Sequence, residues 1–182
     1  MNDYEIREAF CNYIDDTHSD KVCIIDELVI GKARADIVIV TDFLTGYEIK
    51  GDNDSYTRLP DQIKEYDKYF QQNYLVVGES HRKSAPRYVP PYWGIMCFFE
   101  SEKSVQAETL REAESNPKFS LKKQLELLWR KELINILRYN KLPKCSGKNK
   151  SHIRKFLLEN VPKPDLQKQI CEELFERDWT LL

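Results

Sequence analysis

The chain has 182 residues, of which 41% are hydrophobic and 12% aromatic, so it can bury one proper core and is not a disordered chain. No apolar run is long enough to span a bilayer, and the five cysteines show no CxxC spacing, so we expect a cytoplasmic protein with reduced thiols and no zinc site. The net charge of −2 hides an asymmetry, because residues 1–70 hold 8 Lys/Arg against 16 Asp/Glu, whereas residues 118–155 hold 12 against 2. The basic part either follows a phosphate backbone or is a solvated helical surface.

The first hundred residues predict a helix followed by a mixed sheet. Apolar side chains recur at helical spacing over residues 3–14, and β-type runs follow at 21–30, 34–40 and 46–50, with a turn at 31–32 and a hairpin connection at 41–46 that uses Asp42 and Gly46. A helix from residue 60 to about 71 and strands at 74–77 and 92–99, joined by a loop at 78–91, continue the pattern. We therefore expect an α/β fold in which a mixed central sheet of about five strands is flanked by helices.

The remaining residues predict a helical extension of this core. Residues 102–119 are polar and predict a connecting helix or a linker broken near Asn116 and Pro117. Residues 121–139 carry a strong helical stripe, and residues 151–160 and 162–179 predict a helical hairpin, with Ser151 or Asn149 as the first N-cap. We divide the chain into a core at 1–101 and a linker with a basic helical extension at 102–182.

Three polar side chains converge at the ends of the second and third predicted strands. Asp36 stands at the head of one apolar run, and Glu48 and Lys50 end the next, where they point the same way because strand faces alternate with period two. Carboxylate oxygens of this kind suit Mg²⁺ or Mn²⁺, which complete their shells with water and substrate phosphate. A lysine beside such a metal can orient or activate an attacking water, so this edge of the sheet predicts phosphodiester hydrolysis.

Gln62 and Tyr66 share a face of the predicted helix that follows, because they are four residues apart. Such a stripe is ordinarily part of a core, but here it follows the Glu48 strand at close range. We therefore expect Gln62 to steady Lys50 or a water, and Tyr66 to contact a phosphate.

Asp36, the triplet Glu48-Ile49-Lys50 and the later Gln62-xxx-Tyr66 resemble the PD-(D/E)xK nuclease superfamily, in the branch that adds a QxxxY helix. Residues 46–70, with the later YLVVGESH and PYWGIM, resemble more closely a small bacterial family within that superfamily. The resemblance implies a restriction-endonuclease-like core and a hydrolase that cleaves nucleic acid with a bound metal. It implies that Asp36, Glu48 and the backbone carbonyl of Ile49 hold one or two Mg²⁺.

The resemblance also implies a further metal-binding carboxylate on the first helix, for which Glu8 is the most similar position. An exposed helix carboxylate is an equal alternative reading of Glu8. Glu27 is a rival, because a charge inside an apolar β run needs a partner or a metal. Arg34, two residues before Asp36, is the partner that the sequence offers.

We expect a magnesium-dependent nuclease that binds DNA and makes no contact with a membrane. The sequence leaves open whether the protein also forms a homo-oligomer or binds a protein partner. Lys148, Lys150, Arg154 and Arg58 are the candidate backbone contacts, because the segment SGKNKSHIRKFLL loosely resembles helix-extended-loop-helix modules. Packing of this segment against the sheet is the other interpretation. The alternative function is a catalytically idle nuclease-fold protein that binds nucleic acid or a protein partner.

Overall fold

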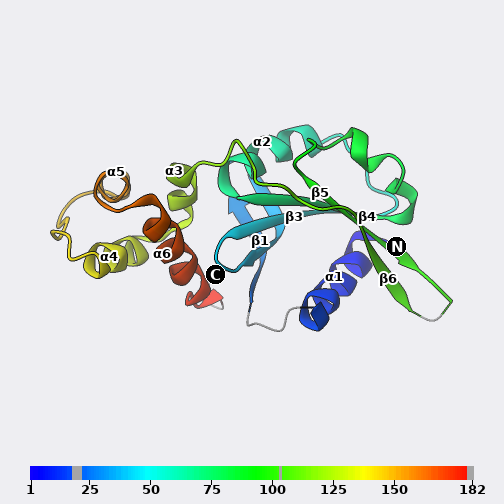
Figure 1. Ribbon diagram of the computed structural model, residues 1–182, viewed down its shortest axis with the longest axis horizontal. Helices are drawn as coiled ribbons and strands as arrows, with labels where there is room; N and C mark the ends of the chain where they lie inside the picture. Colours follow the sequence, from blue (N-terminus) through cyan, green and yellow to red (C-terminus); the bar gives the residue numbers. More distant parts are fainter. Residues whose placement is uncertain (18–21, 103, 180–182) are drawn as a thin grey trace.

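A six-stranded mixed sheet forms the centre of the protein, in a computed structural model that describes residues 1–17, 22–102 and 104–179. Strands β1 to β3 run antiparallel, β3 to β5 run parallel, and β6 is antiparallel to β5. Helices flank the sheet, and further helices follow at the C-terminal end, which confirms the predicted fold class (Figure 1). In spatial and chain order the strands are β1 (Cys23–Ile30), β2 (Ala33–Val40), β3 (Leu44–Lys50), β4 (Gln72–Gly78), β5 (Gly94–Glu100) and β6 (Val105–Arg111). The start of the first predicted strand, at residue 21, lies outside the described residues.

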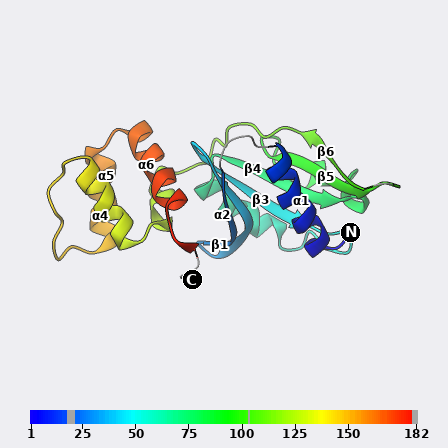
Figure 2. The ribbon, with the colours of Figure 1, turned by 90° about the horizontal axis from the view of Figure 1, so that it is seen from below.

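One helix covers each face of the sheet. α1 (Asp3–Thr17) crosses the face seen from below in Figure 2, and its buried stripe packs against apolar side chains of β2, β3, β4 and β5. α2 (Leu59–Tyr69) covers the other face and begins with a proline in its first turn, where the missing N–H costs nothing. Each helix therefore seals one apolar layer, and the predicted amphipathic spacing of both helices is confirmed. The stripe of α1 consists of Ile6, Phe10 and Ile14.

β3 begins earlier than the sequence predicts, since Gly46 lies inside the strand rather than in the preceding turn. A Cβ atom at Gly46 would come within 2.4 Å of the Phe70 ring and 2.9 Å of the Tyr66 ring. The glycine is needed for the close approach of α2 to the strand, and not for the turn.

The prediction of a helix or linker after residue 102 is wrong, because Val105–Arg111 forms β6 along the edge of β5. This strand is largely exposed and polar, so it lacks the apolar alternation that marks a half-buried strand. The sheet thus continues beyond residue 101, and the division into two domains stays a prediction. The predicted loop at 78–91 also contains two short 3₁₀ turns, η1 (Glu79–His81) and η2 (Ala85–Arg87).

The single helical stripe predicted at 121–139 is interrupted. It is divided into α3 (Leu121–Gln124), the 3₁₀ turn η3 (Leu125–Leu127) and α4 (Arg130–Tyr139), with extended backbone at Leu128 and Trp129. α5 (Lys150–Asn160) and α6 (Lys163–Phe175) form the predicted hairpin, and the Asn149 side chain caps α5 by accepting the His152 N–H at 2.9 Å. Buried leucines of these helices join the apolar layer beneath α2, so the extension and the sheet share one core.

Arg177 contacts the residues at the interruption before α4. Its buried guanidinium donates to both carboxylate oxygens of Glu132 at 2.7 and 2.5 Å and to the Leu127 carbonyl at 2.9 Å. The same group lies over the rings of Trp129 and Trp179, at 4.3 and 4.6 Å from their centroids. Glu132 also caps α4, since its carboxylate accepts the Trp129 N–H at 2.6 Å. The break before α4 therefore coincides with both a local cap and a contact from far along the chain.

We predict that Arg177→Ala lowers the free energy of unfolding by about 3–5 kcal/mol, because it leaves the Glu132 carboxylate buried without its counter-charge. Urea unfolding followed by circular dichroism measures the change. The exposed Arg138→Ala is the matched control and should change stability by less than about 0.5 kcal/mol. A comparable loss in both variants would show that the buried pair is not what stabilises the C-terminal helices.

Candidate active site

A cleft of about 1360 Å³ opens where β2 and β3 separate. β2 pairs with β1 from Ala33 to Val40, apart from Asp36, but with β3 only over Ile37–Val40. The cleft is lined by residues of α1, the β1–β2 hairpin, the end of β3, the loop after β3 and one side of α2. The divergence of two neighbouring strands therefore creates the space in which a substrate can approach the sheet.

Asp36 lies at a break in the β1–β2 ladder. The pairing passes from Asp26–Ile37 to Leu28–Ala35 and omits Glu27 and Asp36, and Glu27 has a positive φ of 57°, which is uncommon outside glycine. The Asp36 N–H donates instead to the Tyr66 hydroxyl at 3.1 Å, and its carbonyl accepts from the Arg7 guanidinium at 2.8 Å. Side chains from two helices thus satisfy the backbone groups that the ladder has released.

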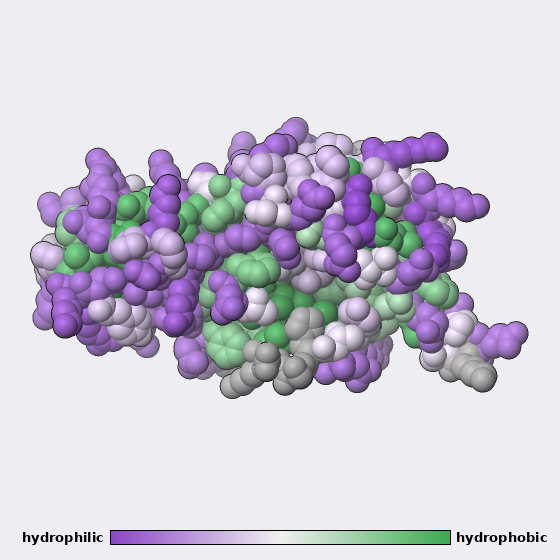
Figure 3. All heavy atoms as spheres, in the orientation of Figure 1, coloured by the Kyte–Doolittle hydropathy of each residue, from purple (hydrophilic) through white to green (hydrophobic). Residues whose placement is uncertain are grey.

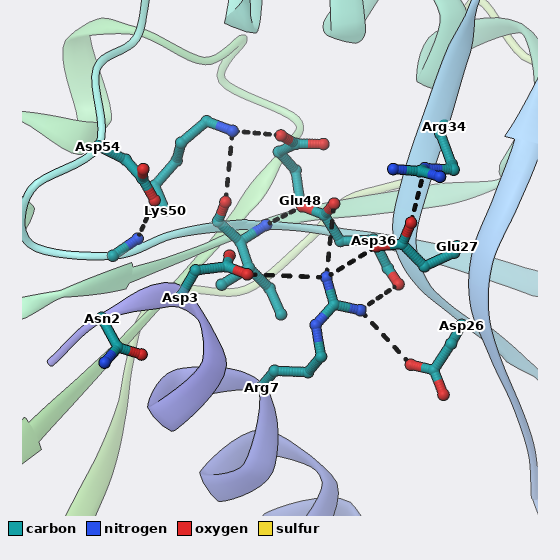
Figure 4. Close-up of polar contacts among 12 residues, drawn as sticks. Asn2, Asp3, Arg7, Asp26, Glu27, Arg34, Asp36, Glu48, Lys50 and Asp54 are labelled. Carbon is teal, nitrogen blue, oxygen red and sulfur yellow. Dashed lines mark hydrogen bonds and ion pairs between the residues drawn. The ribbon is translucent and has the colours of Figure 1, made fainter.

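The Asp36 carboxylate reaches across the gap to β3, where it accepts the Ile49 N–H at 2.8 Å. Glu48 and Lys50 share the α2 face of β3, as their spacing predicts, and Glu48 is fully buried. The Lys50 ammonium donates to Glu48 and, at 3.3 Å, to the Ile49 carbonyl (Figure 4). The structure therefore brings Asp36, Glu48 and Lys50 together at one end of the sheet.

α2 holds Glu48 from above. The Gln62 amide donates to one carboxylate oxygen of Glu48, and the Tyr66 hydroxyl donates to the other at 2.8 Å. Tyr66 is completely buried, so the expected contact with a phosphate is wrong, and its hydroxyl positions Glu48 and Asp36 instead. Gln62 lines the cleft, and its Oε1 atom is buried with no hydrogen-bond partner in the described part of the chain.

Arg7 on α1, and not Glu8, faces Asp36. Glu8 is exposed and lies outside the cleft, so the expectation that it completes a metal site is wrong. Glu27 does line the cleft, but its carboxylate pairs with Arg34 at 2.6 Å, as the sequence suggested, and with Arg7 at 3.5 Å. The sequence analysis missed Arg7, although its place beside the buried Ile6 put it near the sheet-facing side of the helix.

The Arg7 guanidinium lies among four carboxylates in Figure 4. Its nitrogen atoms are 3.9 Å from Asp3, 3.5 Å from Asp26 and 3.6 Å from the Asp36 side chain, besides the contact with Glu27. Arg34 is a second cation in this group, since it pairs with Glu27 at 2.6 Å. Two arginines therefore face four carboxylates, and the α1 side of the cleft stays acidic.

Burial raises the pKa of Asp36 to about 7, and repulsion from the nearby Glu48 carboxylate adds to the shift. The Ile49 N–H, Lys50 and Arg7 oppose it, but they do not restore the ordinary value. Burial and the two carboxylates likewise raise the pKa of Tyr66 well above its usual range, which keeps the hydroxyl protonated as a donor to Glu48. The site therefore holds two mutually repelling carboxylates.

These residues fit a hard divalent cation. Asp36, Glu48 and the Ile49 carbonyl present only oxygen donors, and Mg²⁺ usually takes one or two protein carboxylates and keeps several waters. The repulsion that raises the pKa of Asp36 is the effect that a divalent cation would relieve. Among the described residues, no group of three or more His, Cys, Asp or Glu side chains is arranged to hold a metal.

The candidate nucleic-acid contacts lie in two places. Arg58 is exposed and lines the cleft. Lys148, in the turn before α5, and Lys150, the first residue of α5, are exposed at the end of the long axis remote from the N-terminus, where hydrophilic side chains dominate the surface (Figures 1 and 3). Arg154 donates to the carbonyls of Leu125 and Glu126 at 3.1 and 3.2 Å, so two of its guanidinium nitrogens cap η3, and its contact with a phosphate stays a prediction.

A family profile described as Bacteriophage P4 protein cII matches residues 1–178. The chain belongs to this cII family. No curated protein and no solved structure matches it. The family description names no activity, and it leaves the resemblance to PD-(D/E)xK nucleases an expectation, so the function of this cII-family chain is argued from the site itself.

Within the described residues of the cII-family chain, no helix has the length and apolar character that crossing a bilayer requires.

We predict that Asp36→Asn flattens the pH dependence of thermal stability in EDTA. Because the pKa of Asp36 is raised to about 7 on folding, the folded state binds an extra proton between about pH 4 and pH 7. Wild-type stability should therefore fall as the pH rises through that window, by up to about 1.4 kcal/mol per pH unit. The variant should be the more stable protein at pH 8.

Thermal unfolding between pH 5 and pH 8 measures this difference. Asp61→Asn, which alters an exposed carboxylate at the rim of the same cleft, is the control and should keep the wild-type slope. Identical slopes in Asp36→Asn and wild type would show that the carboxylate is not the titrating group.

Proposed function

We propose that this cII-family protein is a metal-dependent nuclease that hydrolyses phosphodiester bonds in DNA. The observation that carries the proposal is the convergence of Asp36, Glu48 and Lys50 where β2 and β3 diverge into an open cleft. Two carboxylates and an ammonium in a cleft are the groups that metal-assisted phosphodiester hydrolysis requires. Gln62 and Tyr66 support the same reading, since both hold the Glu48 carboxylate in place.

Asp36 and Glu48, with the Ile49 carbonyl, would hold Mg²⁺ or Mn²⁺. When bound, such a cation stabilises the charge that develops on the scissile phosphate. Lys50 would leave its contact with the Ile49 carbonyl and orient or help deprotonate the attacking water. The water oxygen bonds to phosphorus, one bridging P–O bond breaks, and the leaving oxygen takes up a proton.

The distribution of positive charge supports a polymeric substrate. Three exposed cations take part in no ion pair in the described part of the chain: Arg58 at the rim of the cleft, and Lys148 and Lys150 at the distant start of α5. Exposed, unpaired cations release counterions when they meet phosphates, which favours binding to a polyanion such as DNA.

Arg7 favours a second candidate function, a catalytically idle protein that keeps the fold and binds nucleic acid or a protein partner. Its guanidinium already neutralises Asp36 together with Asp3, Asp26 and Glu27. In such a protein the acidic cluster would be a structural ion-pair network with no need of a metal. The two candidates differ in whether cleavage depends on added Mg²⁺ and on Glu48.

We predict that Glu48→Gln abolishes Mg²⁺-dependent cleavage, because it removes a negative metal ligand while keeping the side-chain volume. Lys50→Ala and Lys50→Arg should both bind DNA but turn over about 10²–10⁴-fold more slowly, since arginine moves the charge and cannot act as a proton carrier. Single-stranded, duplex, nicked and branched DNA, incubated with Mg²⁺, Mn²⁺ or EDTA, provide the assay.

Asp61→Asn is the matched control, because its exposed carboxylate lies at the rim of the cleft and pairs with Lys64 at 2.7 Å, away from Glu48. It should cleave at the wild-type rate. Cleavage that survives Glu48→Gln would refute the metal assignment, and an absence of cleavage on every substrate with intact DNA binding would favour the idle protein.

We predict that replacing Lys148 and Lys150 with Ala weakens duplex binding for all sequences alike, because phosphate contacts position a protein without specifying a sequence. Each lost contact should reduce the slope of log K against log salt by roughly 0.9, or about 1.8 for the pair. Titration of duplex DNA onto metal-free Glu48→Ala protein at several salt concentrations measures the slope. An unchanged slope would show that Lys148 and Lys150 face solvent and do not contact DNA phosphates.

A further inference from the structure

Tyr88 forms an exposed aromatic surface next to the cleft. Its side chain is 49% exposed, and its ring stacks on Tyr56 with centroids 4.1 Å apart and an interplanar angle of 26°. On the other side, Tyr56 contacts the His81 ring at 4.7 Å. Tyr88 is thus the outer member of a group of three rings, with one face covered and the remainder open to solvent.

Tyr56 connects this surface to the candidate active site. The residues on both sides of it line the cleft, but Tyr56 itself does not, because its ring points away and meets Tyr88. The lining residues of this wall are Asp54, Ser55, Thr57 and Arg58. The same short loop therefore borders the cleft and carries the ring on which Tyr88 stacks.

The segment that carries Tyr88 is firmly attached to the fold. Its neighbours Ala85 and Val89 are buried, and the Arg111 guanidinium holds the carbonyls of Pro90 and Trp93 at 2.8 and 2.7 Å. Ser80 also ties this segment to the loop after β3, since its N–H donates to Asp52 at 2.8 Å. The ring is exposed although its neighbours are fixed, so its position is built into the fold.

Exposed cations lie on the two segments that carry Tyr88 and Tyr56. Lys83 and Arg87, in the segment of Tyr88, and Arg58, two residues after Tyr56, are exposed, and no ion pair involves them among the described residues. Glu79 and Glu108 share one further cation, Arg82, and Asp54 on the cleft wall is an exposed carboxylate. The four cations of this group therefore exceed its three carboxylates by one.

We propose that Tyr88, with Lys83, Arg87 and Arg58, binds unpaired nucleobases and their phosphates, so that the cleft receives single-stranded nucleic acid at this end. The inference rests on the proposed nuclease function and specifies its substrate. Bases in a duplex are stacked within the helix and cannot cover the ring, whereas every unpaired base offers a face for stacking. Exposed cations beside an aromatic ring are the combination that single-strand binding uses.

The test is a fluorescence anisotropy titration of the whole protein in EDTA, so that cleavage plays no part. The probes are a short thymidine oligonucleotide, the same length of abasic backbone, and a blunt duplex. Tyr88→Ala should weaken binding of the thymidine oligonucleotide about tenfold or more and leave the abasic and duplex affinities unchanged. Tyr88→Phe keeps the ring and should bind like wild type. Tyr139→Ala, which removes another exposed tyrosine from α4, is the control and should alter nothing.

Replacing Lys83 and Arg87 with Ala should reduce the salt slope for single strands by about 1.4, at roughly 0.7 for each contact. Equal binding of wild type and Tyr88→Ala would overturn the proposal. So would an equal loss for the abasic probe, or an acidic peptide that competes as well as the oligonucleotide. If Tyr88→Ala binds like wild type while cleavage depends on Glu48, the single-strand proposal fails and the nuclease proposal stands. If Tyr88→Ala loses binding while no cleavage depends on Glu48, the protein binds single strands but is not the proposed nuclease.

Discussion

The buried carboxylate of Glu48 is the constraint on which the site depends. An isolated carboxylate without solvent is strongly unfavourable, so it must be surrounded by donors. Lys50 supplies one from the same strand face, and Gln62 and Tyr66 supply two from α2. Those contacts fix α2 above β3, and the close approach there requires Gly46. The Tyr66 hydroxyl also accepts the N–H of Asp36 where the β1–β2 ladder is broken. The side chain that hydrogen-bonds the buried Glu48 carboxylate therefore also holds Asp36 at the cleft.

The sequence predicted this part of the site because its signals are local. Two residues along a strand, or four along a helix, share a face wherever those elements form, so the approach of Glu48 to Lys50 and of Gln62 to Tyr66 follows from spacing alone. The contact of Arg7 with Asp36 could not be predicted in this way. Adjacent residues on a helix point about 100° apart, and the rotation of α1 against the sheet decides which of them faces Asp36. β6 and the break at Trp129 were missed for a related reason. The pairing with β5 and the contact with Arg177 that accompany them lie elsewhere in the chain.

The acidic side of the cleft presents a choice between two cations. Arg7 is shared among four carboxylates and makes no short contact with any of them, since its nitrogen atoms lie near 3.5 Å from three carboxylates and 3.9 Å from Asp3. A divalent metal carries twice the charge and binds oxygen at about 2 Å, so it would compete well for Asp36. Arg7 also donates to the Asp36 carbonyl at 2.8 Å, and that contact can persist when the carboxylate turns to a metal. In a nuclease, the arginine would then be left facing the cleft with charge to offer a phosphate.

The cleft runs along α2, and its two ends differ in chemistry. Arg58, Gln62, Glu65 and Lys68 line it in succession, so it follows the whole length of the helix. At one end the loop after β3 stacks Tyr56 on Tyr88, and at the other the Lys68 carbonyl accepts the N–H of Ser120, where the chain enters the basic C-terminal helices. A polyanion lying along α2 would meet an exposed aromatic ring at one end, whereas at the other the lysines Lys68 and Lys123 already pair with Glu65 and Glu126. The end at Tyr88 is thus the one whose chemistry suits an unpaired base.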